Sequence, residues 1–278
     1  MTAIPKMRIA RFTPVQRVFH ALLMVAFLIQ AATGLARMYM ETGWGQSLGA
    51  MFGVYEAARA THIYVGIFML IGIAVHAGYI LMRINWRGFP ASLWGPDSLT
   101  PGAVDVRQFF QHIGWFLGIR RPPDFDRWGY WEKFDYWAVF WGMTIIGVTG
   151  LMMAYPFFTT RYIPGWGLNV AFWVHRIEAL LAMGHIFIIH FFIAHLRRHN
   201  FPMDRAMFEG STVQSVSEEE KPAWVKRLKE SGAWGQVLVA EVEGGRRVAF
   251  YLFGYAALFC GVFLLIGAIL NLTGVSWY

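Results

Sequence analysis

Residues 171–196 read AFWVHRIEALLAMGHIFIIHFFIAHL, an almost unbroken apolar run that contains four histidines. A helix needs roughly 20 apolar residues to cross the hydrocarbon core of a bilayer, so this run is long enough to span a membrane. Similar apolar runs lie at residues 16–38, 58–82, 134–155 and 248–271. The sequence therefore predicts an all-α integral membrane protein with five transmembrane helices.

The composition agrees with this prediction. The 278 residues are 56% hydrophobic and only 15% charged, whereas soluble proteins average about 25% charged residues. The single cysteine, Cys260, excludes an intramolecular disulfide, an iron–sulfur cluster ligated within the chain and a c-type haem attachment motif. Any haem is therefore expected to be held noncovalently. No internal repeat stands out.

The basic residues are sorted between alternate segments of the chain. The tail up to Arg17 and residues 83–133 and 197–247 contain 4, 7 and 9 lysines and arginines, whereas the alternate loops contain only Arg37, Arg59 and Arg161. By the positive-inside rule, the N-terminus is cytoplasmic and the C-terminus lies on the outer side. The net charge of +7 is thus explained by membrane lipid and topology, and we expect no nucleic acid partner.

Two segments of about 50 residues lie between the spans on the cytoplasmic side. In the first, VDVRQFFQHIGWFLG at residues 104–118 has apolar residues at helical spacing, which is typical of an amphipathic helix at the membrane interface. In the second, Ser217 with Glu220 resembles a capping box that opens a short helix. Either segment could bind a soluble partner.

The histidines are concentrated in the apolar spans. Ionisable groups inside a membrane are costly and usually face a cofactor, a cavity or a partner. A single histidine of this kind would be weak evidence for a ligand site. Of nine histidines, however, seven lie in or at the ends of spans: His20, His62, His76, His175, His185, His190 and His195.

The spacing of these histidines suits two haems stacked across one bilayer. An α-helix rises about 1.5 Å and turns about 100° per residue, so His62 and His76 lie about 40° and roughly 21 Å apart. His175 and His190 lie about 60° and roughly 22 Å apart. Each of the two helices could therefore offer one ligand to each haem.

The direction of each span then predicts the pairing. His62 and His175 both lie near the outer face, so we expect them to hold an outer haem. An inner haem would have His190 on one side, and either His20 or His76 on the other.

Arginines near these histidines could bind the haem propionates. Arg17 and Arg59 each lie three residues before a candidate ligand, on the same helix face, and Arg176 adjoins another. The alternative is that these arginines reach toward lipid head groups. Small residues one turn further on, Gly66 and Ala179, leave room for a flat macrocycle, although small residues also let helices pack closely.

Other assignments stay open at this point. A zinc site gathers three or four ligands within a few ångströms, which fits histidines at two depths less well than two haems do. A proton relay through histidine and Glu178 is compatible with haem. A transporter should show discontinuous helices or inverted repeats, and a haem-free structural anchor does not explain the histidines.

Spans one to four resemble a known family. Residues 11–35, RFTPVQRVFHALLMVAFLIQAATGL, have its Arg-x-x-His opening and Thr-Gly close, and THIYVGIFMLIGIAVH at 61–76 has its His-x-x-x-Gly start. Residues 8–210 as a whole resemble the cytochrome b subunits of membrane-bound formate dehydrogenases and nickel–iron hydrogenases. Residues 132–156 and 175–204 look most like the dihaem relatives found beside multihaem c-type cytochromes.

The resemblance implies two b-type haems, each with two histidine ligands to iron. In that family one ligand comes from span one, one from span two and two from span four. Carried over, these are His20, His62, His175 and His190, which favours His20 over His76 for the inner haem. The additional histidines and the fifth span go beyond the pattern, so that a third haem or a histidine-lined quinone pocket stays open.

The resemblance also implies the membrane-anchoring subunit of a respiratory complex in the bacterial inner membrane. Such a subunit passes electrons between menaquinone or ubiquinone and a partner redox subunit, here a multihaem c-type cytochrome or an iron–sulfur protein. We expect the quinone near the inner haem, where His76 or His195 could exchange protons; an outer site near Glu178 is the alternative.

The chain should then divide into three parts. Residues 1–200 would form a four-helix cytochrome b domain, residues 201–247 a cytoplasmic segment, and residues 248–278 the fifth transmembrane helix with a short outer tail.

Overall fold

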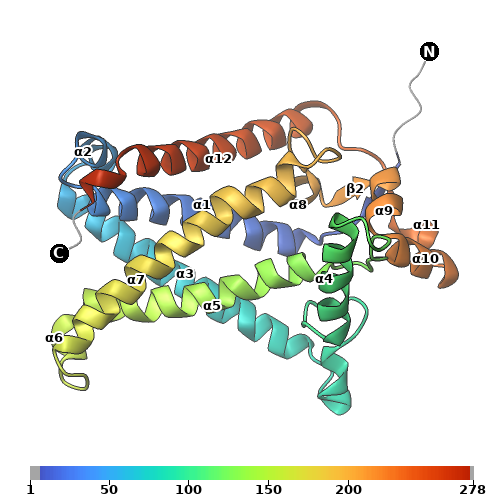
Figure 1. Cartoon of the computed structure of the whole chain (residues 1–278), viewed down its shortest axis with the longest axis horizontal. Coiled ribbons are helices and arrows are strands. Elements are labelled where there is room, and N and C mark those ends of the chain that lie inside the picture. The colour runs from blue at the N-terminus through green and yellow to red at the C-terminus, as the bar shows by residue number, and fades with distance from the viewer. Residues whose placement is uncertain (1–6, 276–278) are drawn as a thin grey trace. The chain divides into compact units, whose positions relative to one another are not determined.

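The structure is a computed structural model that describes residues 7–275, and most of its regular elements are helices (Figure 1). Within those residues, five helices are long and apolar enough to cross a membrane. They are α1 (Pro14–Met38), α3 (Tyr55–Arg83), α5 (Tyr130–Ala154), the helix Trp166–Leu196 that begins as α7 (Trp166–Gly184), and α12 (Gly244–Leu270). The five predicted spans are thus confirmed.

The spans begin a few residues earlier than hydropathy predicted. The third begins at Tyr130 instead of residue 134, and the fourth at Trp166 instead of residue 171. Tyrosine and tryptophan are amphipathic and favour the membrane–water interface, so a helix can continue through them beyond its apolar run.

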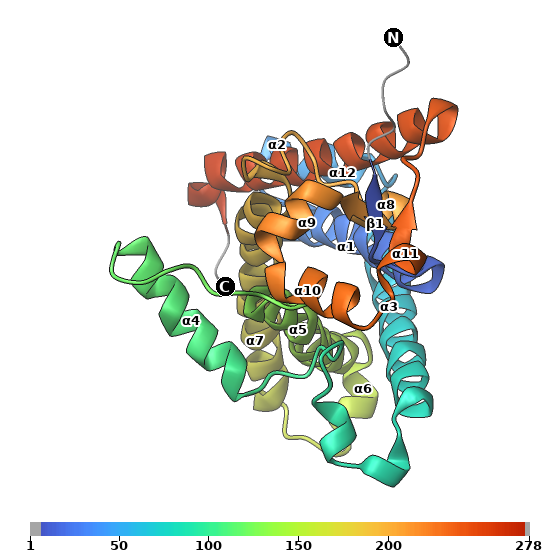
Figure 2. The same cartoon turned by 90° about the vertical axis from the view of Figure 1, so that its right-hand side faces the viewer.

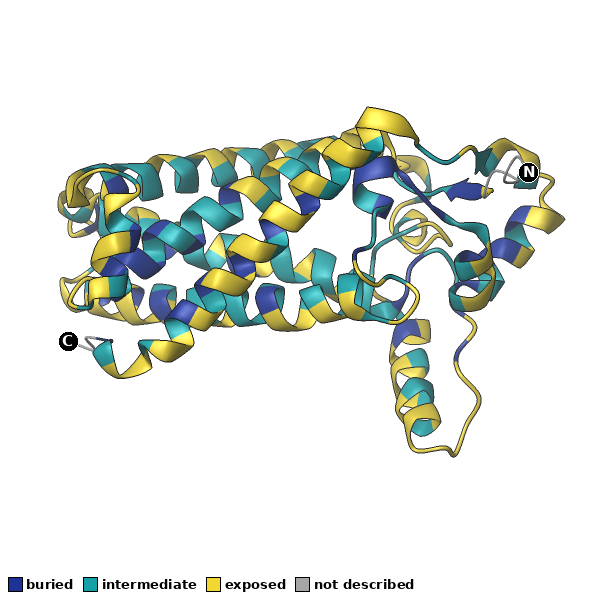
Figure 3. Ribbon diagram, turned by 90° about the horizontal axis from the view of Figure 1, so that it is seen from above, coloured by how far each residue is buried: buried dark blue, intermediate teal, exposed yellow. Residues whose placement is uncertain are grey.

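Most side chains on the spans are not buried by the protein itself. Buried residues make up at most 28% of the most apolar stretch of any span. Exposed residues, yellow on the ribbon in Figure 3, recur along the long helices. Many exposed residues of the spans are large and apolar, such as Phe68, Trp141 and Phe259. Because apolar side chains are favourable in hydrocarbon and costly in water, these surfaces are suited to lipid.

The fourth span departs from α-helical geometry after Gly184. Residues His185–His190 and Phe192–Leu196 form π-helical turns that continue α7. A π-helix is bonded from residue i to i+5 and is found mostly as single turns, frequently at functional sites. The angle and rise predicted between His175 and His190 assumed a uniform α-helix, so that estimate is wrong beyond Gly184.

The described residues form two compact units. The sheet unit comprises residues 7–17, 77–139 and 205–250, and the histidine unit comprises residues 18–76, 140–204 and 251–275. The predicted outer tail ends in residues 276–278, which lie outside the described residues.

A small antiparallel sheet organises the sheet unit. Strand β1 (Arg8–Ala10) lies between β2 (Ser211–Val213) and β3 (Leu238–Val239). The segment before span one therefore pairs with the segment between spans four and five, which requires both to lie on the same side of the membrane. The same unit includes residues 84–129, so it contains most of all three basic segments, in agreement with the sorting of charge.

Short helices cover this sheet. They are α8 (Ala206–Glu209), α9 (Gln214–Glu220), α10 (Pro222–Glu230) and α11 (Trp234–Val237), and Figure 2 shows α10 and α11 near strand β1. Ile9 is fully buried and packs with Trp224, Val225 and Leu228. The core of the sheet unit thus joins β1 to α10.

The predicted capping box at Ser217 is wrong. Ser217 lies in the middle of α9, where its hydroxyl lies 2.6 Å from the Thr212 hydroxyl and 3.2 Å from the Val213 carbonyl oxygen. The next helix, α10, begins instead at Pro222, whose missing N–H costs nothing at a first helical position.

The predicted amphipathic helix is confirmed as α4 (Ala103–Phe116). The Asp105 carboxylate accepts a hydrogen bond from the Gly102 backbone N–H at 2.7 Å and pairs with Lys133 at 3.0 Å. Phe110 and Phe116 are largely exposed. An exposed aromatic face of this kind suits the membrane interface.

The fifth span packs within the histidine unit, which also contains α2 (Gly43–Ala50) and α6 (Pro156–Thr159). Leu264 of α12 is buried with Leu35, Tyr39 and Phe187. The Tyr39 hydroxyl donates a hydrogen bond to the Ala268 carbonyl at 2.9 Å. Because these contacts join α12 to α1 and to the fourth span, the fifth helix is part of the folded bundle.

Candidate functional site

Two histidines from different spans lie beside each other in the histidine unit. The ring centres of His62 on α3 and His175 on α7 lie 6.2 Å apart, with their planes at 67°. A histidine nitrogen binds a transition metal at about 2 Å and lies about 1 Å from its own ring centre, so two rings on opposite sides of one metal have centres roughly 6 Å apart. The separation of His62 and His175 therefore fits a single iron between them.

A threonine hydroxyl contacts the Nδ1 atom of the His62 ring. Thr33 Oγ1 on α1 lies 2.9 Å from Nδ1 of His62, and the same hydroxyl donates a hydrogen bond to the Ile29 carbonyl at 2.7 Å. Gly34, the next residue, is packed against the ring. The imidazole is thus held at its Nδ1 side by one turn of α1.

The same arrangement holds His175 against α5. Its Nδ1 lies 2.9 Å from the Ile146 carbonyl oxygen and 3.2 Å from Thr149 Oγ1. Thr149 donates its own proton to the Ile145 carbonyl at 2.7 Å, and Gly150 packs against the ring. Both rings are therefore held at Nδ1 by a Thr-Gly pair of the preceding span.

The sequence interpretation gave no role to these threonines. The signal that identifies them is the tripeptide Thr-Gly-Leu, which occurs at residues 33–35 and again at 149–151. Three identical residues are too few to stand out as an internal repeat, and only the matching contacts with His62 and His175 give them a meaning.

The arginines near this pair lie in different surroundings. Arg176 is buried, with its guanidinium 5.5 Å from the Phe172 ring centre, whereas Arg59 is exposed and pairs with Glu56 at 3.7 Å. Arg37 acts electrostatically on both His62 and His175, and its Nε is buried without a hydrogen-bond partner among the described atoms. A buried guanidinium nitrogen of this kind suits a carboxylate.

A second group of histidines lies where α1 meets the π-helical turns. His20, His190 and His195 lie within electrostatic range of one another. The ring centres of His190 and His195 lie 6.3 Å apart, with planes at 89°. Five residues separate these two histidines, the spacing at which a π-helix makes its backbone hydrogen bonds.

The other predicted residues lie in varied surroundings. The His76 ring packs against Phe19 at 5.0 Å and Phe140 at 5.8 Å between centres. In the sheet unit, Arg17 donates a hydrogen bond to the Phe208 carbonyl.

The sequence suggested that Gly66 leaves space for a macrocycle. The side-chain amide of Gln30 lies against Gly66 in this structure and occupies that space.

Among residues 7–275, no three histidine, cysteine, aspartate or glutamate side chains lie close enough together to hold a metal ion by themselves. A zinc site of three or four protein ligands would need such a cluster. A haem would need only two ligands from the protein, and His62 and His175 would be such a pair.

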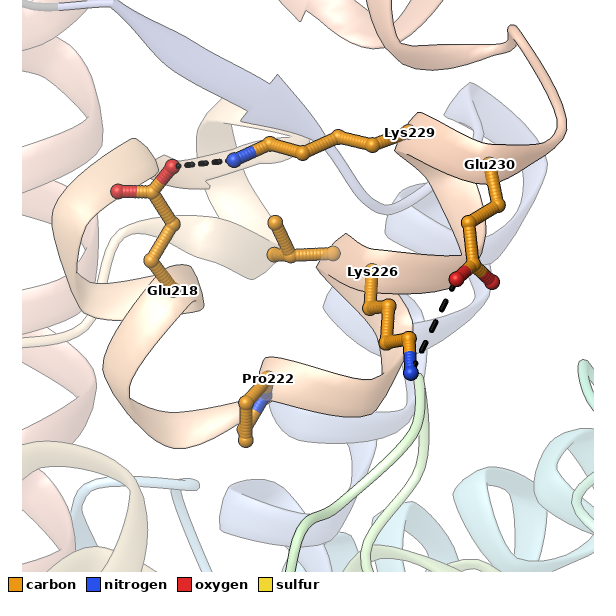
Figure 4. Close-up of a pocket in the computed structure, with 6 residues that line it drawn as sticks. Glu218, Pro222, Lys226, Lys229 and Glu230 are labelled. Carbon is orange, nitrogen blue, oxygen red and sulfur yellow. Dashed lines mark hydrogen bonds and ion pairs between the residues drawn. The ribbon is translucent and has the colours of Figure 1, made fainter.

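A separate open pocket lies on α9 and α10 of the sheet unit (Figure 4). Glu218 pairs with Lys229 at 3.2 Å, and Lys226 pairs with Glu230 at 3.8 Å. Each lysine is matched by a carboxylate, so the pocket has no excess charge to attract an ionic cofactor.

Comparison with known proteins agrees with the geometry. Residues 11–210 match the family described as prokaryotic cytochrome b561. The chain is 22% identical over 226 residues to the formate dehydrogenase cytochrome b556(fdo) subunit of Escherichia coli, covering 80% of this chain and 94% of that protein. It is 24% identical over 221 residues to the formate dehydrogenase cytochrome b556 subunit of Haemophilus influenzae, covering 79% of this chain and 83% of that protein.

The matched residues include the first four spans and both groups of histidines. The family's b-type haem also fits the opposed rings of His62 and His175. The chain therefore belongs to the prokaryotic cytochrome b561 family and is a membrane cytochrome b.

Proposed function

We propose that this chain is the dihaem, membrane-anchoring subunit of a respiratory redox complex, and that it passes electrons between the quinone pool and a partner redox subunit. The observation that carries the proposal is the separation of 6.2 Å between the ring centres of His62 and His175, on two different spans. The relatives in Escherichia coli and Haemophilus influenzae, both named as formate dehydrogenase subunits, support the role of a subunit.

The outer haem is held by His62 and His175. Arg176, which is buried, and Arg37, which is half-buried with a buried Nε, supply positive charge within the same unit, and this charge suits propionate groups. Arg59 is exposed beside Glu56, so any contribution from it would come from the surface. We therefore add Arg37 to the predicted propionate partners.

The inner haem is held by His20 and His190. His20 and His190 lie within electrostatic range of each other, whereas the His76 ring packs against Phe19 and Phe140. These contacts favour His20 over His76 as the ligand opposite His190. His195 then lies beside the inner site as a third histidine.

Bound b-type haem supplies one-electron chemistry. The residues of this chain would hold the two haems at two separate groups of histidines in the histidine unit. Residues 1–200 form the part that holds the haems, with residues 201–247 on the cytoplasmic side and the fifth span as an additional packing element.

Menaquinone or ubiquinone binds near the inner haem. His195 and His76 are titratable groups of the histidine unit that could exchange protons with the quinone. The outer alternative is Glu178, whose carboxylate oxygen lies 3.6 Å from the position of a Cβ on Gly142. A quinone at the inner site requires no residue beyond those already grouped there.

The five apolar spans and the prokaryotic family agree with a multi-pass protein of the bacterial inner membrane. The N-terminus lies in the cytoplasm, because the basic segments are gathered in the sheet unit. The partner carries the catalytic centre and is a multihaem c-type cytochrome or an iron–sulfur protein.

The spectrum of the full chain, purified in detergent, tests this function. A reduced α-band of b-type haem, with a pyridine haemochrome ratio near two haems per chain, is the expected result. Menadiol, a soluble reduced menaquinone analogue, should reduce both haems. Absence of the α-band would overturn the function, and a ratio near three would overturn the ligand assignment.

A further inference from the structure

We propose that Thr33 and Thr149 are positioning residues that fix the tautomer of His62 and His175, so that each ring presents Nε2 to the haem iron. The inference rests on the proposed function, because it assumes that these two histidines are haem ligands. It goes beyond that function because it names the side chains that orient the two histidine rings for binding iron.

The hydrogen bonds of Thr33 determine which atom carries the proton. A threonine hydroxyl has one proton, and that of Thr33 is donated to the Ile29 carbonyl at 2.7 Å. Its oxygen can then act only as acceptor toward Nδ1 of His62, 2.9 Å away. Nδ1 therefore carries the imidazole proton, and Nε2 keeps the lone pair that a metal ligand needs.

His175 reaches the same state through two acceptors. A carbonyl oxygen can only accept, so the contact of 2.9 Å with Ile146 requires a proton on Nδ1 of His175. Thr149 is a second acceptor at 3.2 Å, because its own proton goes to the Ile145 carbonyl. The Nε2 atom of His175 is thus also left as the free ligand.

The two arrangements correspond residue by residue. Gln30 and Ile146 each lie three residues before a threonine, and the Gln30 backbone also interacts with the His62 ring. We call Thr33 with His62 one half-site and Thr149 with His175 the other. Both half-sites use the carbonyl and hydroxyl of one helical turn to orient a histidine of the next span. A ligand that donates its second N–H to such an acceptor is oriented and made more basic toward the metal.

The half-sites differ in how much they depend on threonine. Thr33 lies 2.9 Å from Nδ1 of His62, whereas for His175 the Ile146 carbonyl, at 2.9 Å, is closer than Thr149, at 3.2 Å. Removing the Thr33 hydroxyl should therefore have the larger effect. If the two threonines only stabilised the helix bundle, no difference between them would follow from these distances. A larger effect at Thr33 than at Thr149 therefore indicates that the threonines position the histidine ligands.

The test uses the full chain in detergent, with Thr33→Val, Thr149→Val and the hydroxyl-retaining Thr33→Ser. Thr33→Val should weaken the haem at this site about 10-fold, the effect expected for a lost partner of a metal ligand. It should also raise the midpoint potential of that haem, because a less basic ligand stabilises ferric iron less. Thr149→Val should give a smaller shift, and Thr33→Ser should restore the wild-type potential.

Thr144→Val is the matched control. Thr144 makes the same hydrogen bond to the carbonyl four residues before it, at 2.7 Å, and is exposed. A potential shift in Thr144→Val equal to that in Thr33→Val would overturn the proposal. If Thr33→Val does not assemble, Thr33→Ala removes the same hydroxyl without bulk and carries the same expectations.

His62→Ala separates this inference from the function on which it rests. If His62→Ala keeps both haems, the proposed ligand assignment fails. If His62→Ala loses one haem while Thr33→Val and Thr149→Val keep the wild-type potential and haem affinity, only the positioning role of the threonines fails.

Discussion

The His175 ring lies so close to Gly150 that the Cβ of any other residue there would come within 3.1 Å of its Cε1 atom. The same contact between Gly34 and His62 is looser, at 3.4 Å. Gly150→Ala should therefore displace the His175 ring and lower the haem content of purified protein more than Gly34→Ala. Overpacking of this kind typically costs about 1–3 kcal/mol.

Gly72→Ala on α3 is the control for these variants, because a Cβ at Gly72 meets nothing within 4 Å. It should keep the wild-type haem-to-protein ratio and reduced spectrum. Equal haem loss in Gly72→Ala and Gly150→Ala would contradict a steric role for Gly150.

Removal of single histidines should divide the haem content in a defined way. His20→Ala and His62→Ala should each halve the haem-to-protein ratio, because each removes one proposed ligand of a different haem. His76→Ala should keep both haems. The pyridine haemochrome assay measures the ratio, and the two single variants should leave different reduced α-bands.

His112→Ala is the control outside the spans, since His112 lies on α4 of the sheet unit, 3.0 Å from the Tyr130 hydroxyl. It should retain the full haem content. Loss of haem in His76→Ala with retention in His20→Ala would reassign the inner ligand to His76.

The fifth span depends on a close contact between Gly267 and Trp44. A Cβ on Gly267 would lie 2.3 Å from two atoms of the Trp44 ring. Gly267→Ala should therefore destabilise the histidine unit by about 1–3 kcal/mol, although alanine favours a helix more than glycine does. The melting temperature of the detergent-solubilised protein measures this loss.

Gly245→Ala provides the comparison at the start of the same helix, where a Cβ meets nothing within 4 Å. It should leave the melting temperature unchanged or slightly raised. A lower melting temperature in both variants would mean that α12 tolerates no added side chain, and the specific contact with Trp44 would not be the cause.

The sheet unit should lose one stabilising interaction in acid. Arg227 on α10 donates hydrogen bonds to Asp97 at 2.8 Å and to Asp126 at 2.7 Å. The hydrogen bonds from Arg227 hold the pKa of Asp97 below its usual range. Since the pKa is lower in the folded state, the interaction stabilises the fold above the ordinary pKa of about 4. It is lost as the pH falls through the lower, folded value.

A comparison of wild type with Arg227→Met measures this interaction. Wild type should melt at a higher temperature than Arg227→Met at pH 6, and the difference should shrink toward pH 3. Lys226→Met, which removes only the exposed pair with Glu230, should show no such difference. A gap between wild type and Arg227→Met that stays constant with pH would show that Asp97 does not carry the effect.

Hydropathy and histidine spacing predicted the five spans and placed His62 and His175 at one level, because both patterns are local properties of the helices. The contacts of Thr33 and Thr149 depend on the register between neighbouring helices, which neither pattern contains. The π-helical turns after Gly184 were missed for a different reason. A shift from i+4 to i+5 hydrogen bonds leaves the apolar composition of residues 185–196 unchanged.

The arginines near the candidate site also show that sequence patterns do not contain the contacts between helices. Arg59 was expected near the His62 haem because it lies one helical turn away in sequence, and its side chain is exposed and pairs with Glu56. Arg37 is distant from His62 in sequence but lies within electrostatic range of it, on α1 beside α3. Spacing along one helix gives no information about a residue that approaches from another helix.

Strand β1 also constrains the order in which the protein can be made. Arg8 of this strand bonds to Ser211, 203 positions later in the chain. Four of the five spans lie between those residues, so the ribosome must release all four before β1 meets either neighbouring strand. The sheet unit can therefore close only late in biosynthesis, and a nascent chain that stops before Ser211 cannot contain the sheet.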